Sequence, residues 1–241
     1  MSMLFGLSKR RTKEIFVLKF FSVVDYSGAV NFKVVDVLDF CVSTAKDQID
    51  LVSWNYGARE WRRYDTFRNF QEAKNDTVNL SMYSGEKSVV SFGNALLNQK
   101  KSVAEKKYGT IEVTVCFDDM SDPEFCSSFF RGMAERERFD YGYASSFSEK
   151  QIKEGIHGVV VDMEQTDVET GRIFDVKNGY IKNIYRYNLL NTKQLEILGK
   201  QGCVIGEISR ISHELQLLVL TEDNIRSVRN SVSFPLVDMR S

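Results

Sequence analysis

The stretch from Thr110 to Phe117 constrains the fold most, because its side chains alternate between apolar and polar along the chain. One face carries apolar residues and the other mostly polar ones: Ile111, Val113, Val115 and Phe117 against Glu112, Thr114 and Cys116. A period of two residues predicts a β-strand with one buried face. Such a half-buried strand packs its apolar face against a core, so the chain is expected to build a sheet over a core.

Further strands are predicted where apolar runs are bounded by turn-forming residues. They cover residues 14–24, 50–54, 77–83, 88–92, 141–147, 158–163, 204–211 and 214–220. The third and fourth runs flank Gly85, and the last two flank Ser212 and His213, so each of these pairs predicts a hairpin.

Helices are predicted where apolar residues recur at helical spacing after a capping residue. They cover residues 31–46, 121 to about 136, 189–198 and 221–232, with a further short helix at residues 66–73. Ser121 with Glu124 has the spacing of a capping box, and Asn191 or Thr192 is suited to cap the third helix. Because strands and helices are mixed without regular alternation, we predict an α+β fold: a mixed, mostly antiparallel sheet with flanking helices.

The 241 residues are expected to form one α+β domain. The most polar stretch of the chain runs from about residue 99 to 109, so a division into two lobes, about 1–98 and 109–241, stays open.

Charge and hydropathy exclude several partners. The chain has 32 Lys and Arg against 33 Asp and Glu, so its overall charge gives no reason to expect a nucleic-acid partner. No apolar run reaches the ~20 residues that span a bilayer, so we expect no membrane partner. The basic cluster near the N-terminus follows a short apolar stretch, the reverse of a secretory signal, and we expect a cytoplasmic protein.

The four cysteines, Cys41, Cys116, Cys126 and Cys203, form no CxxC pair. Two of them lie inside apolar runs, so we interpret them as buried, reduced thiols. We therefore expect no metal site and no cofactor.

Asp162, Asp175 and Lys177 are the candidate catalytic residues of an alternative reading. A Val-rich strand ending in Asp162, followed by Asp175-Val-Lys177, resembles the core of the PD-(D/E)xK nucleases, although Val161 stands where that core has proline. The resemblance implies a Mg²⁺-dependent nuclease in which two carboxylates hold the metal and the lysine activates water. The competing interpretation makes Asp162 a strand-end residue and the other two a solvated hairpin face.

The segment from Trp54 to Tyr64 is the candidate partner-binding surface. It gathers the residue types that dominate protein interfaces. They are Trp54, Tyr56, Arg59, Trp61, Arg62, Arg63 and Tyr64. The alternative interpretation places both tryptophans in the core and the arginines in solvent. Residues 180–188 hold a second group, Tyr180, Tyr185 and Tyr187, which we expect to be half-buried.

Residues 184–195, the strands within 202–220 and the Asp140-Tyr-Gly-Tyr-Ala144 stretch resemble bacterial proteins encoded beside secreted toxins. The resemblance implies a non-enzymatic, cytoplasmic immunity protein of an interbacterial polymorphic-toxin system, which neutralises a cognate protein toxin by binding it. It supplies no catalytic residues. The other classes left open are the nuclease and a structural or accessory protein of a phage or secretion apparatus.

Overall fold

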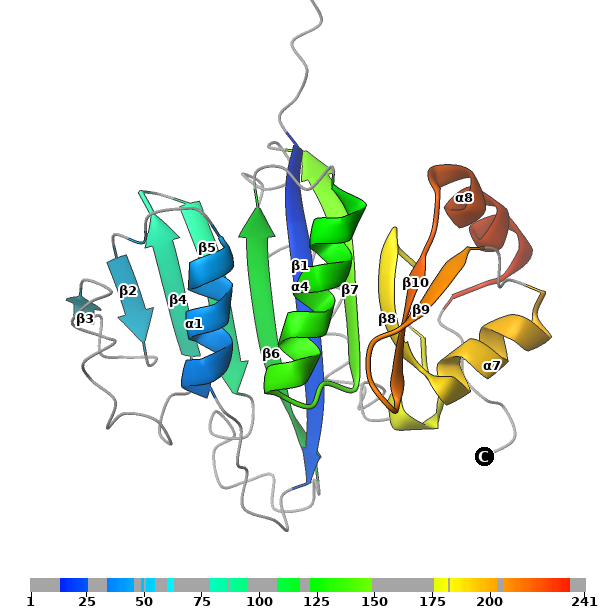
Figure 1. Cartoon of the computed structure of the whole chain (residues 1–241), viewed down its shortest axis with the longest axis horizontal. Coiled ribbons are helices and arrows are strands. Elements are labelled where there is room, and N and C mark those ends of the chain that lie inside the picture. The colour runs from blue at the N-terminus through cyan, green and yellow to red at the C-terminus, as the bar shows by residue number, and fades with distance from the viewer. Residues whose placement is uncertain are drawn as a thin grey trace, which may run out of the picture.

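The computed structural model describes residues 14–25, 34–45, 49, 51–54, 60–62, 79–85, 87–94, 108–117, 122–148, 176–181, 183–202 and 206–234 (Figure 1). Within these residues ten strands form one sheet, in the order β3-β2-β4-β5-β6-β1-β7-β8-β10-β9. Each neighbouring pair is antiparallel. The α+β prediction is confirmed, with a described sheet that is antiparallel rather than mixed.

The strand bounds are β1 (Glu14–Asp25), β2 (Leu51–Trp54), β3 (Glu60–Arg62), β4 (Asn79–Ser84), β5 (Lys87–Asn94), β6 (Tyr108–Phe117), β7 (Tyr141–Ser148), β8 (Tyr187–Asn191), β9 (Glu207–Arg210) and β10 (Leu215–Val219). The helices are α1 (Val34–Thr44), α4 (Pro123–Arg136), α7 (Thr192–Lys200) and α8 (Glu222–Ser231). None of the helices in the described residues is long and apolar enough to cross a membrane.

Strand β1 lies at the centre of the sheet, between β6 and β7. Its Phe16, Leu18 and Phe20 face one side and its Val17 and Phe21 the other, and all five are buried. Burial on both faces explains why this segment is an almost unbroken apolar run instead of an alternating one.

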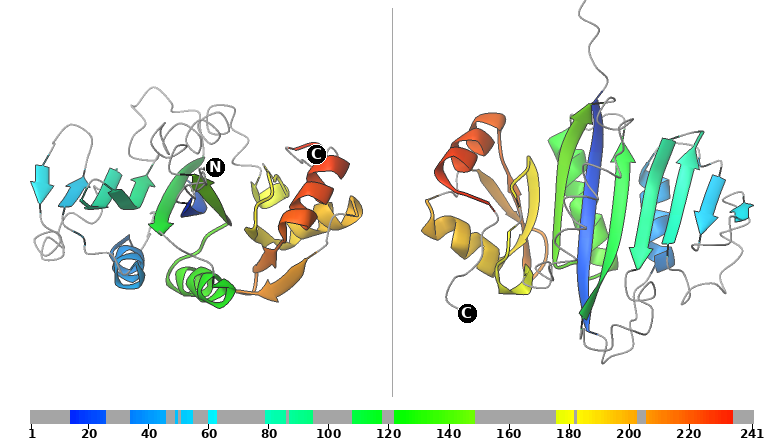
Figure 2. Two further views of the ribbon diagram at one scale, coloured as in Figure 1. Left: turned by 90° about the horizontal axis from the view of Figure 1, so that it is seen from above. Right: turned by 180° about the vertical axis from the view of Figure 1, so that it is seen from behind.

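Helices α1 and α4 lie next to each other on one face of the sheet (Figure 2). Phe20 of β1 contacts the rings of Phe129, Phe130 and Phe139, with centroids 5.0–6.1 Å apart. This aromatic contact belongs to the larger core cluster, which extends from Val52 in β2 to Leu217 in β10. The same core therefore spans most of the width of the sheet.

A second core lies on the opposite face, around β7, β8 and β10, and includes residues of α7 and α8. Tyr143 and Tyr185 stack there with ring centroids 4.1 Å apart and planes 13° from parallel. Tyr180, Tyr185 and Tyr187 are buried, at most 7% exposed, so the expectation that they are half-buried was wrong. Tyr180 and Tyr185 precede β8 and pack in this second core, whereas Tyr187 of β8 packs in the first, so none of the three keeps a solvent-facing side.

The observed starts of α4 and α7 lie after the predicted ones. The predicted helix at residues 66–73 and the predicted strand at residues 158–163 lie outside the described residues. Helix α4 is capped by the Asp122 side chain, which accepts a hydrogen bond from the Glu124 amide, and Ser121 lies outside the described residues. Helix α7 begins only at Thr192, after a capping box between Asn191 and Gln194. The predicted start at residue 189 was wrong because Leu189 belongs to β8, where burial on both faces mimics helical spacing.

The polar stretch at residues 99–109 separates β5 from β6 in the sequence. Those two strands pair directly, from Val90 with Val115 to Asn94 with Ile111. The sheet is therefore continuous across the proposed lobe boundary, and the division into lobes stays a prediction.

Candidate functional site

The described part of the predicted partner-binding segment lies in β2 and β3, at one end of the order of described strands. The backbones of Trp54, Trp61 and Arg62 belong to strands β2 and β3, which pair with Val52 opposite Arg62. Tyr56, Arg59, Arg63 and Tyr64 lie outside the described residues. A role for this segment in binding stays a prediction.

Of the three nuclease candidates, Lys177 is described, and Asp162 and Asp175 lie outside the described residues. The Lys177 Nζ atom donates a hydrogen bond to the Val23 carbonyl oxygen at 3.1 Å. It also lies 3.7 Å from Oδ1 of Asp140, with about half of its side chain exposed. The lysine is thus engaged at the end of strand β1, and its meeting with the two candidate carboxylates stays a prediction.

Asp140 makes two hydrogen bonds to the backbone of the C-terminal part of β1. Strand β1 continues to Asp25, but its register with β7 ends at Phe21 opposite Tyr141. The Asp140 amide donates to the Phe21 carbonyl at 2.8 Å, and the Asp140 Oδ2 atom accepts from the Val23 amide at 2.7 Å. One carboxylate thereby replaces a missing strand neighbour and satisfies a buried backbone donor.

Burial raises the pKa of the Asp140 carboxyl above its ordinary value, while the hydrogen bond from Val23 and the charge of Lys177 oppose the rise. Desolvation is the largest effect because the side chain is only 10% exposed. These contacts give Asp140 and Lys177 a structural role in the sheet.

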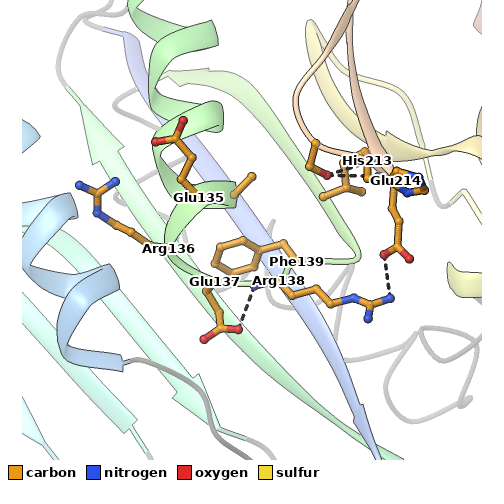
Figure 3. Close-up of a pocket in the computed structure, with 10 residues that line it drawn as sticks. Glu135, Arg136, Glu137, Arg138, Phe139, His213 and Glu214 are labelled. Carbon is orange, nitrogen blue, oxygen red and sulfur yellow. Dashed lines mark hydrogen bonds and ion pairs between the residues drawn. The ribbon is translucent and has the colours of Figure 1, made fainter.

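A pocket of about 480 Å³ lies between the end of α4 and the β9–β10 turn (Figure 3). Its rim includes Glu135, Arg138, His213 and Glu214. Arg138 and Glu214 form an ion pair of 2.7 Å across it, and both side chains are more than half exposed. The pocket also has apolar lining residues, Ala134, Phe139 and Leu215, so it is an open surface depression with an exposed ion pair at its rim.

Several polar groups that line the pocket make local contacts. Ser212 Oγ accepts hydrogen bonds from the amides of Glu214 and Leu215, at 3.4 and 3.2 Å, as expected in a turn. Arg136 points away toward α1, where its guanidinium lies 4.0 Å from the centre of the Phe40 ring. The described part of the pocket thus presents an ion pair and a histidine rather than an activated nucleophile.

The described thiols, those of Cys41, Cys116 and Cys126, are buried and form no disulfide with one another, as predicted, whereas Cys203 lies outside the described residues. Burial raises the pKa of Cys126 to about 11 and that of Tyr187 to about 12. Burial also raises the pKa of Cys41. A thiol that stays protonated is a poor nucleophile and a poor metal ligand. Among the described residues, no group of His, Cys, Asp and Glu could hold a metal ion.

Strand β9 forms the edge of the sheet opposite to β3, and its exposed residues were missed by the sequence reasoning. Ile208 is 41% exposed and is the one large apolar side chain that counts as exposed among the described residues. Arg210 is also exposed, and its Nε atom donates to the Ser212 carbonyl at 3.1 Å. The sequence could have revealed this surface only in part, because the apolar run at residues 204–211 predicts a strand but not its position at the edge of the sheet.

The fold and the site define an α+β protein built on one broad antiparallel sheet with a short, accessible edge strand. No family model matches the chain, and no curated protein sequence matches it. Among solved structures, it is similar to the Pseudomonas aeruginosa T6SS protein PA0821, with a TM-score of 0.54 and 14% identity over 86% of this chain. The match covers 66% of PA0821, so this chain spans just under two thirds of that protein's length. At this identity the likeness shows the shared fold.

Proposed function

We propose that this chain is a non-enzymatic, cytoplasmic immunity protein that binds and neutralises a cognate bacterial toxin. The observation that carries the proposal is the fold likeness to a T6SS protein, which extends over 86% of the chain. It agrees with the resemblance of residues 140–144, residues 184–195 and the strands within 202–220 to proteins encoded beside secreted toxins.

The described surface supports a protein partner. The pocket rim is charged and open, and the β9 edge exposes an apolar side chain next to an arginine. Protein interfaces combine such apolar anchors with a polar rim. The net charge is −1, so affinity has to come from local contacts rather than from attraction of the whole molecule.

Co-expression with the products of the adjacent genes tests the proposal. Each neighbour is expressed alone and with this chain in a laboratory host, and growth and co-purification are measured. We expect one neighbour to arrest growth, this chain to restore growth, and the two proteins to purify as a complex. A toxic neighbour that arrests growth equally with and without this chain would contradict the proposal.

An accessory role in a secretion apparatus is the second candidate, because the name of the structural neighbour is compatible with it. The same experiment separates the two. An accessory component would co-purify with a neighbour that does not affect growth, whereas an immunity protein has to suppress toxicity.

A further inference from the structure

We propose that the outer edge of β9 captures the toxin by pairing with an extended toxin segment, which adds one more strand to the sheet. This inference rests on the proposed function and names the surface that carries it out. Strand addition to an exposed sheet edge is a general mode of peptide recognition: backbone hydrogen bonds supply affinity, and alternate side chains supply specificity.

The backbone geometry determines which groups the edge offers. The Ile211 amide donates to the Leu215 carbonyl at 3.0 Å, so these opposite residues form a hydrogen-bonded pair with β10. In an antiparallel ladder such pairs recur at every second residue, which directs Ser209 and Glu207 toward Leu217 and Val219. The N–H and C=O groups of Ile208 and Arg210 therefore point outward, and within the described residues no strand pairs with them.

The two outward-bonding residues also carry the side chains that a partner would recognise. Ile208 and Arg210 are two positions apart, so their side chains share one face of the strand. The exposed isoleucine offers an apolar contact, and the arginine is held by its hydrogen bond to the Ser212 carbonyl. The complementary toxin strand has an apolar residue opposite Ile208 and an acidic residue opposite Arg210.

A second copy of this chain fits the edge less well. In an antiparallel dimer, β9 of one copy would pair with β9 of the other through the outward N–H and C=O groups of Ile208 and Arg210. Three registers allow this: Ile208 opposite itself, Arg210 opposite itself, or the two opposite each other. The first puts Arg210 opposite Gly206, the second puts like charges together, and the third puts an apolar side chain against a cation. Each leaves the arginine without a counter-charge, so charge complementarity favours a strand from another protein.

The test measures calorimetric affinity for the toxic neighbour identified by co-expression. Ile208→Pro removes an outward N–H and the apolar contact, and proline is tolerated at an edge where its nitrogen faces solvent. Arg210→Glu reverses the charge, and Lys193→Glu is the matched reversal at an exposed position of α7. We expect both β9 variants to bind about 30-fold or more weakly, as at interface hot spots, and Lys193→Glu to bind within about twofold of the wild type.

Amide hydrogen exchange gives a readout that does not depend on substitution. In the free protein the amides of Ile208 and Arg210 should exchange much faster than that of Ser209, and in the complex they should become at least about tenfold slower. Thermal unfolding will show whether Ile208→Pro folds. If it does not, the affinity of Arg210→Glu and the exchange rates of the wild-type amides test the proposal.

The outcomes separate the two proposals. A wild-type chain that does not bind or neutralise the toxin refutes the proposed function. A wild-type chain that binds the toxin, with β9 variants of unchanged affinity or with unprotected β9 amides, overturns only the inference about the edge. Self-association of the wild type that Ile208→Pro abolishes would also overturn it, because the edge would then pair two copies of this chain.

Discussion

Replacing Asp140 with alanine should destabilise the fold by removing the group that completes the end of β1. The carboxylate is the acceptor for the Val23 amide, at 2.7 Å in a buried setting. A buried donor that loses its acceptor costs about 1–3 kcal/mol. The ion pair with Lys177 adds little, because the lysine side chain is 49% exposed and the charges are 3.7 Å apart. We therefore expect Asp140→Ala to lower the free energy of unfolding by about 2 kcal/mol.

Asp140→Asn is the matched control, because its side-chain oxygen can still accept from Val23 while the charge is gone. It should cost less than about 1 kcal/mol. Urea unfolding of the three proteins at neutral pH gives the comparison. A loss below about 0.5 kcal/mol for the alanine variant, or equal losses for both variants, would refute the role assigned to this carboxylate.

The free energy of unfolding of the wild type, compared with that of Asp140→Asn, should depend on pH in a definite direction. Because burial raises the pKa of Asp140, the folded protein holds this proton more tightly than the unfolded chain does. The free energy of unfolding of the wild type, relative to Asp140→Asn at each pH, should be highest at acidic pH. It should fall as the pH rises through the raised pKa. The opposite slope would mean that Val23 and Lys177 outweigh desolvation.

Three further predictions concern the described core and surface. Peptide mapping after treatment of the native protein with a thiol reagent should find Cys41 and Cys126 unmodified until denaturant is added, because burial keeps both thiols protonated; rapid native modification would contradict their burial. Gly206→Ala should lower the free energy of unfolding by about 1–3 kcal/mol in urea, because a Cβ atom there would clash with the Val219 carbonyl oxygen; an unchanged midpoint would show that the backbone relaxes. Arg138→Ala should change it by less than about 1 kcal/mol, since its ion pair is exposed, and a larger loss would reveal a packing role.

Local patterns were enough to predict most of the elements. The alternation at residues 110–117 gave β6, and the apolar run at residues 14–24 gave β1, because each pattern reflects burial of that strand alone. The start of α7 could not be read this way. Leu189 and Leu190 lie on opposite faces of a sheet covered on both sides, so their burial conceals the period of two.

The site depends on contacts between residues far apart in the sequence. Asp140 meets Val23 only because β7 begins where β1 still continues, and no local pattern encodes that offset. The edge position of β9 likewise follows from the order of all the strands. The sequence therefore predicted the interface at residues 54–64, because of their Trp and Arg content, and gave no reason to single out Ile208.

Titration of the purified toxic neighbour with this chain tests the central claim most directly. An immunity protein that acts by binding should give a calorimetric end point at one equivalent per binding site, and toxin released from the complex by denaturation should have its original mass. An enzyme would inactivate many equivalents of toxin and leave it chemically altered. Complete neutralisation at a small fraction of one equivalent, with a changed toxin mass, would contradict the claim.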